Sequence, residues 1–408
     1  MQQRTIRQIF RETDYIRTGG SPEELRCAEY LLARCREMGA QGHIESFPVQ
    51  MAEMQEAHLF AGDREIPCKG FFNCGSGEIE APFVYLPNTD AASLSRIRGK
   101  IVLLDTGVGY FGYHDLLENG AAAFITYNGN VNFKDRDIDQ KELRAYVSGG
   151  EKILGVNIHV SDAVELVKSK PQSVRIVIRQ REYEGESHNV VAELPGKSDE
   201  WIVLSAHYDS TPLSRGAYDN MTGCVGLLGI LEALKKEAPH RYGLRFVFCG
   251  SEERGLLGSK AYVAAHEQEL SKIALNINLD MIGTLMGKFI ACCSAEQGLV
   301  DYIAYFSRMR GWGMEARQGV YSSDSTPFAD KGVPALSFAR LAGGNIAPIH
   351  NRYDTAAVLS MERMQEDTAF IAAFTAAMAD AVKCPVGRDI PEKVRTELDE
   401  YMNRKRKK

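Results

Sequence analysis

The stretch WIVLSAHYDSTPLSRGAYDNMTGCVGLLGILEALKKEAPHRYGLRFVFC (201–249) decides the fold. It holds an apolar run at 201–206, a helix-forming segment at 222–236 and a second apolar run at 244–248. Strand, helix and strand in this order are typical of a βαβ unit with parallel strands. The alternation continues through IALNINL (273–279), FIACC (289–293), a helix near 297–310, VPALSFA (333–339) and a helix from about 361 to 383. The sequence therefore predicts an α/β fold whose mostly parallel central sheet is flanked by helices.

The rhythm of the sequence changes twice, which indicates an insertion. SPEELRCAEYLLARCREMG (21–39) predicts an amphipathic helix with Ser21 as its N-cap and Gly39 as its stop. From about 57 to 183 the pattern consists of short strands and Gly- and Asp-rich turns. We therefore expect an N-terminal helical part at 1–56, an inserted β-rich α+β domain at 57–183, the main domain at 184–388 and a charged tail at 389–408. The tail ends in NRKRKK and is expected to be a solvated helix.

Composition excludes several classes of protein. The chain of 408 residues carries 48 Lys+Arg against 54 Asp+Glu, and this mild acidity argues against a nucleic-acid partner. No apolar run approaches the ~20 residues of a membrane span, and the start MQQRTIRQIF lacks the apolar region of a signal peptide. The nine cysteines are scattered without a CxxC spacing, which is typical of buried thiols in a reducing compartment. We therefore expect a cytoplasmic protein without a membrane partner.

Histidines and carboxylates follow the predicted strands of the main domain. They are His207 and Asp209 after 201–206, Glu252 and Glu253 after 244–249, Asp280 after 273–279, Asp219 at the Gly-rich start of the next helix, and His350 in the loop after 333–339. A single Asp after a strand is commonly a turn or a helix cap. In an open α/β sheet, however, the carboxyl ends of the strands meet at the edge where ligands bind. The whole set therefore predicts a site at that edge.

These residue types are ligands of zinc, for which Mn²⁺ or Co²⁺ could substitute. The adjacent carboxylates Glu252 and Glu253 repel each other at the end of a buried strand unless a positive charge lies nearby. In the spacing HxD, Asp209 can orient the ring of His207, as ligating histidines usually require. Two Zn²⁺ ions balance three carboxylates and one hydroxide, so Glu252 remains as a general base. The sequence thus predicts two zinc ions.

Five segments, in order, carry a resemblance to a known family. SAHYDS (205–210), AYDNMTG (217–223), GSEERGLLGS (250–259), NLDMIG (278–283) and IHNRYDT (349–355) resemble the signature segments of the co-catalytic zinc aminopeptidases. This family includes aminopeptidase Y and the bacterial leucyl aminopeptidases, and the resemblance covers 1–55 and 184–385. Within the insertion, GKIVLLDTG (99–107), ENGAAAFITYN (118–128) and ILGVNIHVSDAVELVK (153–168) resemble a protease-associated domain.

The resemblance implies a zinc-exopeptidase fold of the phosphorylase/hydrolase-like type and a role for each candidate residue. One zinc would be held by His207 and Asp280, the other by Glu253 and His350, and Asp219 would bridge them. Asp209 would orient His207, and Glu252 would act as general base. The implied activity is release of N-terminal residues from peptides, so a peptide is the expected substrate.

Three alternatives remain open. A carboxypeptidase or dipeptidase of the same fold would need a basic residue facing the substrate carboxylate, for which Arg215, Arg254, Arg340 and Arg352 are the candidates. A glutaminyl cyclase would use one zinc, and a non-enzymatic relative would have lost ligands. The family also places an oxyanion-stabilising Tyr near a Ser-Asp-His segment. In YSSDSTPF (321–328), Tyr321 is the nearest candidate and Ser325 replaces the His. The side-chain preference and the oligomeric state are left open.

Overall fold

The computed structural model describes residues 1–105 and 107–407 and divides the chain into two compact units. Unit 1 consists of Met1–Pro48 and Glu186–Lys408, and unit 2 of Val49–Gly185. The sequence places these boundaries at 57 and 183, inside the long strands β1 (Gln41–Ala61) and β8 (Ser173–Leu194) that carry the chain between the units. Among the described residues, no helix has the length and apolar character needed to cross a membrane.

Unit 1 contains the predicted mixed sheet, with its strands in the order β13-β12-β14-β11-β9-β10-β8. Its centre is parallel and comprises β14 (Ala335–Leu341), β11 (Ile273–Leu279), β9 (Trp201–His207) and β10 (Gly243–Cys249). β8 is antiparallel to β10, β12 (Lys288–Ser294) is antiparallel to β14, and β13 (Glu315–Gln318) is parallel to β12. The predicted α/β class with a mostly parallel centre is confirmed.

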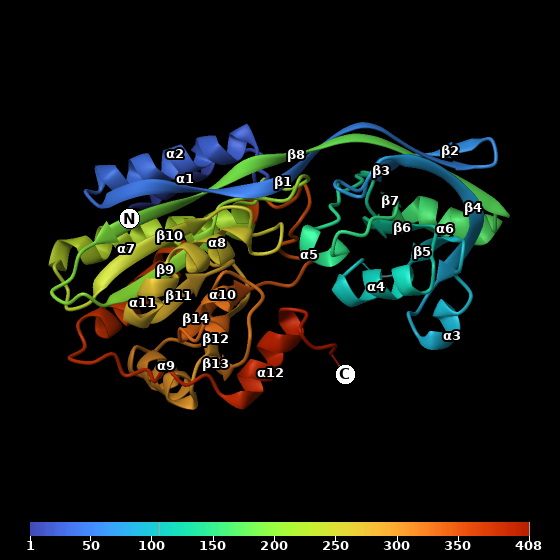
Figure 1. Ribbon diagram of the computed structural model, residues 1–408. Helices are drawn as coiled ribbons and strands as arrows, with labels where there is room; N and C mark the ends of the chain where they lie inside the picture. The colour runs from blue at the N-terminus through green and yellow to red at the C-terminus, as the bar shows by residue number, and fades with distance from the viewer. Residues whose placement is uncertain (106, 408) are drawn as a thin grey trace. The chain divides into compact units, whose positions relative to one another are not determined.

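Helices cover both faces of this sheet (Figure 1). One core contains residues of α1 (Gln3–Glu12), α2 (Pro22–Glu37), α7 (Thr222–Leu234), α9 (Gln297–Met309) and α11 (Met361–Ala379). The other contains residues of α8 (Leu257–Ala265), α10 (Ser325–Asp330) and α12 (Glu392–Tyr401). In β9, Ile202 and Leu204 belong to the first core and Val203 to the second. Both faces of the strand are therefore buried, which explains its continuous apolar sequence.

Helix α2 shows how local sequence sets an element. The Ser21 side chain accepts a hydrogen bond from the backbone N–H of Glu24 at 3.1 Å, and Pro22 occupies the first helical position. Gly39 follows the end of the helix with φ +78°, a left-handed conformation that suits glycine. The predicted N-cap and stop of this helix are confirmed.

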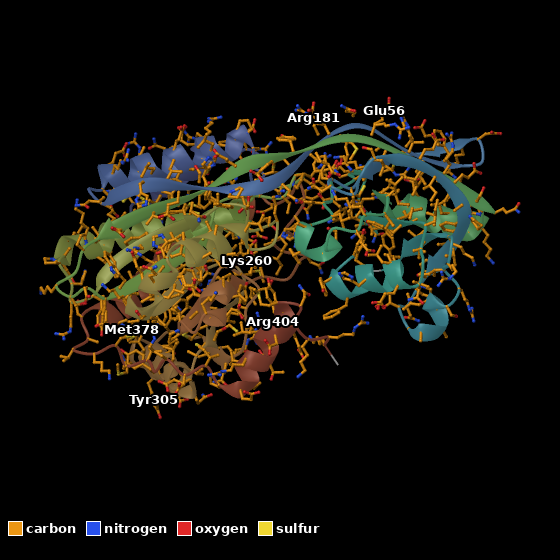
Figure 2. The ribbon with its side chains drawn as sticks, in the orientation of Figure 1. Glu56, Arg181, Lys260, Tyr305, Met378 and Arg404 are labelled. Carbon is orange, nitrogen blue, oxygen red and sulfur yellow. The ribbon has the colours of Figure 1, made fainter. Side chains whose placement is uncertain are left out.

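The C-terminal segment is not a solvated tail, and that expectation is wrong. Helix α12 buries Val394 and Leu398 in the second core of unit 1. Arg404, labelled in Figure 2, donates hydrogen bonds to the carboxylates of Asp330 and Asp399. Two apolar residues four positions apart are enough to attach a helix that is otherwise charged. Lys408 lies outside the described residues.

Unit 2 is a smaller α+β unit with its own core, which runs from Leu59 to Ile178. Its strand order is β8-β4-β5-β6-β7-β3, with β4 (Gly77–Leu86), β5 (Ile101–Leu104), β6 (Ala123–Asn128) and β7 (Gly155–His159) mutually parallel and β3 (Cys68–Gly70) antiparallel. β2 (Arg64–Ile66) pairs with β1. The helices are α3 (Ala91–Leu94), α4 (Tyr110–Glu118), α5 (Ala145–Ser148) and α6 (Val160–Ser169).

Candidate metal centre

The carboxyl ends of three parallel strands place most of the predicted residues at one edge of the sheet of unit 1. His207 ends β9, Glu252 and Glu253 follow β10, and Asp280 follows β11. Asp219 lies in η1 (Ala217–Met221), a turn between β9 and α7 in which Asp219 has non-helical backbone angles, and His350 lies in the loop after β14. All except His350 have side chains at most 11% exposed, whereas that of His350 is 48% exposed. The site is therefore a mostly buried group of acids with one partly open side.

Asp219 lies between the two histidines. Its Oδ1 is 3.1 Å from Nε2 of His207, and its Oδ2 is 3.1 Å from Nε2 of His350. Asp280 Oδ1 is 3.8 Å from His207 Nε2, and Glu253 Oε2 is 3.2 Å from His350 Nε2. The structure thus forms two groups that share Asp219. In each of them, one ligand atom from every member lies within 4.8 Å of the others.

Asp209 contacts both His207 and the turn that carries Glu252 and Glu253. Its Oδ1 is 3.4 Å from Nδ1 of His207, on the side of the ring away from Asp219. The same carboxylate accepts the backbone N–H of Glu252 at 2.9 Å and that of Glu253 at 3.2 Å. Asp209 is fully buried. It therefore holds the turn that carries the Glu pair by two hydrogen bonds and places a negative charge beside the ring of His207.

The histidines and Asp219 stabilise one another as charged groups. Burial alone would lower the pKa of His207, but Glu252, Asp209 and Asp219 raise it well above its ordinary value. Burial would likewise lower the pKa of His350, yet Asp219 and Glu253 raise it to about 11. Burial opposes ionisation of Asp219, but hydrogen bonds from both histidines lower its pKa. Protons on the histidines thus supply the positive charge that the acids need.

The other three carboxylates, Asp280, Glu253 and Glu252, have too little positive charge around them to offset their burial. Burial, opposed by His207 and reinforced by Asp219, raises the pKa of Asp280 to about 7. Burial and Asp219 also raise the pKa of Glu253. Burial, opposed by His207 and reinforced by Glu253, raises the pKa of Glu252 well above its ordinary range. Like charges in a buried site favour protonation unless a cation compensates them.

The donor set fits divalent metal ions. Two imidazole nitrogens and three carboxylates are the ligand types that zinc accepts, and Asp219 presents one oxygen to each group. Oδ1 of Asp280 is buried without a hydrogen-bond partner among the described residues, although it points toward His207. A buried acceptor normally has a partner. A cation between His207, Asp219 and Asp280 would provide one.

Two buried acids near the centre were not singled out from the sequence. Asp354 accepts the backbone N–H of Tyr218 at 2.7 Å and that of Asp219 at 3.2 Å, and burial raises its pKa to about 6. Asp324 is fully buried, and burial raises its pKa to about 6. Asp354 is the last residue but one of the segment IHNRYDT, four residues after His350. This spacing from His350 was the one sign of Asp354 in the sequence, because the residues whose backbone N–H groups it accepts, Tyr218 and Asp219, lie far away along the chain.

The segment that follows β13 brings Tyr321 near the site. Burial and the charge of Asp280 raise the pKa of the Tyr321 hydroxyl. Ser325, at the position where the family commonly has His, is buried, and its Oγ lies 2.8 Å from Oγ of Ser337. Ser325 therefore belongs to the packing beneath the site, whereas Tyr321 remains a candidate for contact with a ligand.

The arginines considered for a substrate carboxylate are largely engaged. Arg215 forms an ion pair with Asp14 at 2.8 Å. Arg340 binds both oxygens of the buried Asp367. Arg254 donates to the carbonyl of Gly19 at 3.2 Å. Since Arg215 and Arg340 already have carboxylate partners, the structure does not favour either as the recognition group of a carboxypeptidase.

Paired His and carboxylate groups at the carboxyl edge of an α/β sheet form a candidate metal centre. Residues 189–375 match the model of Peptidase family M28. This part of the chain contains all seven predicted site residues.

Relatives agree with this match. Aminopeptidase YwaD of Bacillus subtilis is 29% identical over 306 residues, which cover 70% of this chain and 63% of YwaD. A probable leucine aminopeptidase 2 of Aspergillus oryzae is 29% identical over 265 residues, which cover 62% of this chain and 52% of that protein. The chain therefore spans less than two thirds of the length of these curated relatives.

Solved structures share the fold over almost the whole chain. An aminopeptidase from Aneurinibacillus sp. strain AM-1 has a TM-score of 0.74 at 23% identity, with 96% of each chain covered. A zinc aminopeptidase from Bacillus subtilis has a TM-score of 0.75 at 24% identity, with 95% of this chain and 98% of that chain covered. Both likenesses establish the fold and include the segment of unit 2.

Proposed function

We propose that the chain is a metal-dependent aminopeptidase that removes N-terminal residues from peptides. The observation that carries this proposal is Asp219, whose two carboxylate oxygens each lie 3.1 Å from a different histidine. One carboxylate between two imidazole-containing groups is an arrangement that can bind two nearby metal ions. The relatives named aminopeptidase, and the zinc aminopeptidase among the solved structures, support the same reaction and the same metal.

The residues would divide into two ligand sets. His207 and Asp280 would hold one zinc ion, Glu253 and His350 the other, and Asp219 both. When bound, such ions lower the pKa of a water molecule to ~7 and polarise the scissile carbonyl. Nε2 of His207 is directed toward Asp219 and Asp280, and Asp209 faces the opposite ring nitrogen at 3.4 Å, from where it would orient the ring.

Glu252 is the proposed general base. Its side chain is 11% exposed, and Oε2 lies 3.9 Å from Nε2 of His207, beyond a hydrogen bond but at the border of the ligand set. The carboxylate would take a proton from the attacking water on Oε2 and give it to the leaving amine nitrogen. Its backbone N–H is held by Asp209, so the base is fixed in position beside the metal ligands.

The first experiment measures metal per chain together with hydrolysis of Leu-p-nitroanilide and its N-acetylated form. We expect about two zinc ions per chain and cleavage of only the substrate with a free α-amine. Two metals without cleavage of either substrate would instead favour a carboxypeptidase or dipeptidase. One metal or none would contradict the ligand assignment, and one metal would favour a cyclase.

For unit 2 we infer the protease-associated domain that its sequence resembles, inserted into the peptidase domain. Its separate core and its parallel strands β4 to β7 support this proposal. The His/Cys/Asp/Glu groups suited to a metal among the described residues all lie in unit 1. Because these groups lie in unit 1, we infer a non-catalytic role for unit 2, such as substrate selection.

A further inference from the structure

Arg17 is a fully buried arginine for which no carboxylate forms an ion pair within residues 1–105 and 107–407. Its guanidinium donates only to backbone carbonyls. The acceptors are Thr13 at 3.1 Å, Tyr15 at 3.0 Å and Gly216 at 2.7 Å, together with Tyr208 and Arg215. A buried charge is costly unless its hydrogen bonds are satisfied. Arg17 meets this condition by binding five carbonyls from two distant parts of the chain.

Three of these carbonyls belong to one loop of the metal centre. Residues 208–216, here called the connecting loop, contain no strand or helix. The loop begins directly after His207 and ends at the turn η1 that carries Asp219. Some of its backbone groups bond to other backbone groups, as the N–H of Tyr208 does to the carbonyl of Cys249 in β10 at 3.0 Å, and side chains supply further partners. Arg17 binds the first residue of the loop and the last two.

Further contacts attach the same loop to the backbone around Arg17. The N–H of Arg17 donates to Oγ of Ser210 at 3.1 Å, and the N–H of Ser210 donates to the carbonyl of Arg17 at 3.2 Å. Gly216 has φ +54°, and a Cβ there would lie 3.0 Å from Nη2 of Arg17 and 2.7 Å from the carbonyl oxygen of Asp219. The loop therefore packs tightly between Arg17 and Asp219.

We propose that Arg17 is a positioning residue that holds His207 and Asp219 at the separation needed for metal binding before the metal arrives. This inference rests on the proposed function. The guanidinium joins the carbonyls at both ends of the connecting loop, so the loop cannot lengthen or rotate without breaking several hydrogen bonds. The guanidinium of Arg17 is fully buried and donates to none of the ligand atoms, so a substrate cannot reach it. Its effect should consequently appear in metal affinity rather than in substrate binding.

The test compares Arg17→Met with Arg245→Met in the full chain. Arg245 is also buried, but it lies near the start of β10, where it contacts Glu193, Tyr262 and Glu269. Zinc affinity is measured by competition with a chromophoric chelator, and folding by circular dichroism. For Arg17→Met we expect zinc affinity about 10- to 100-fold weaker, the range found when groups behind metal ligands are removed. Arg245→Met should lose thermal stability with unchanged zinc affinity.

Two more variants keep the inference testable if Arg17→Met does not fold. Arg17→Lys retains the charge but offers one compact donor group instead of a planar fork, so zinc affinity should also fall. Gly216→Ala keeps Arg17 but would set a Cβ 2.7 Å from the carbonyl oxygen of Asp219 and 3.0 Å from Nη2 of Arg17, so it should displace the end of the connecting loop and weaken zinc binding too. At saturating zinc, KM for Leu-p-nitroanilide should equal that of the wild type.

The outcomes separate the two proposals. Wild-type zinc affinity in folded Arg17→Lys and Gly216→Ala variants would overturn the role of Arg17 and leave the proposed function intact. A wild-type protein that binds no zinc would instead overturn the proposed function. A raised KM at saturating zinc would show that Arg17 acts on substrate rather than on metal.

Discussion

Glu252 and Glu253 are adjacent in sequence but have different surroundings. Glu253 lies 3.2 Å from His350, inside one ligand group, whereas Glu252 lies 3.9 Å from His207 and outside both groups. The same turn can therefore supply one metal ligand and one base. This difference makes the two side chains separable by mutation.

At this scale, Glu252→Gln is expected to keep the metal content of the wild type and lose turnover about 10²- to 10⁴-fold, because the amide cannot accept the proton. Glu253→Gln is the matched control, and it should lose metal. The measurement is zinc per chain beside kcat for Leu-p-nitroanilide. A fully active Glu252→Gln enzyme would show that another group is the base.

The sequence predicted the members of the site whose residue type and position both carry a signal. His207, Asp219 and Asp280 follow strands or open a helix, so strand alternation was enough to bring them together. Arg17 gave no such signal, since its acceptors are backbone carbonyls, which can belong to any residue type, and the three in the connecting loop lie about 190 to 200 positions away. Asp354 was hidden for the same reason, because its donors are backbone amides.

Among the elements, α2 and β8 are joined by a buried polar contact. Glu24 on α2 accepts hydrogen bonds from Ser187 Oγ at 2.7 Å and from Tyr208 OH at 2.8 Å, and its Oε2 lies 3.0 Å from Nδ1 of His188. The hydrogen bond to Glu24 outweighs burial and raises the pKa of His188, with Glu186 and Glu29 adding to the effect. The contact therefore strengthens when His188 is protonated.

This contact predicts a pH-dependent stability. Because the pKa of His188 is higher in the folded chain than in the unfolded one, its contribution is complete below the unfolded pKa, ~6.5, and disappears as pH rises through the folded pKa. His188→Gln should cost about 1–3 kcal/mol of unfolding free energy at pH 5.5 and less at pH 9, as measured by denaturant titration. His43→Gln, at an exposed position, serves as the control. An equal loss at both pH values would contradict the assignment.

Element lengths were predicted well where burial is continuous and poorly where it is not. The helices at 21–39 and 297–310 agree with α2 and α9 within two residues at each end. The middle of β8, at 179–186, is mostly exposed and charged and lacks alternation, so the sequence does not predict a continuous strand there. Most of β1 is likewise exposed or only partly buried. The length of β1 and β8 comes from their hydrogen-bonded pairing with neighbouring strands, which the sequence pattern does not reveal.

On the scale of the whole molecule, the two compact units predict two unfolding transitions. Both tryptophans, Trp201 and Trp312, lie in unit 1, so their fluorescence reports on that unit, whereas circular dichroism reports on both. Removing metal with EDTA should lower the Tm seen by fluorescence by about 5–10 °C if zinc was present at ~100 times its Kd. The transition seen only by circular dichroism should not move. A shift of both, or a single common transition, would contradict independent cores.

The chain passes from unit 1 to unit 2 and back on paired neighbouring strands. β1 pairs with β8, and a Cβ on Gly185 would lie 2.7 Å from Met51 Cγ, so the outgoing and returning segments are adjacent. The pairing of β8 with β10 uses only 190–194, outside Val49–Gly185. In evolutionary terms, a gene could acquire or exchange this segment in a single recombination event, because joining the two ends leaves an ordinary β-hairpin and an unchanged catalytic sheet.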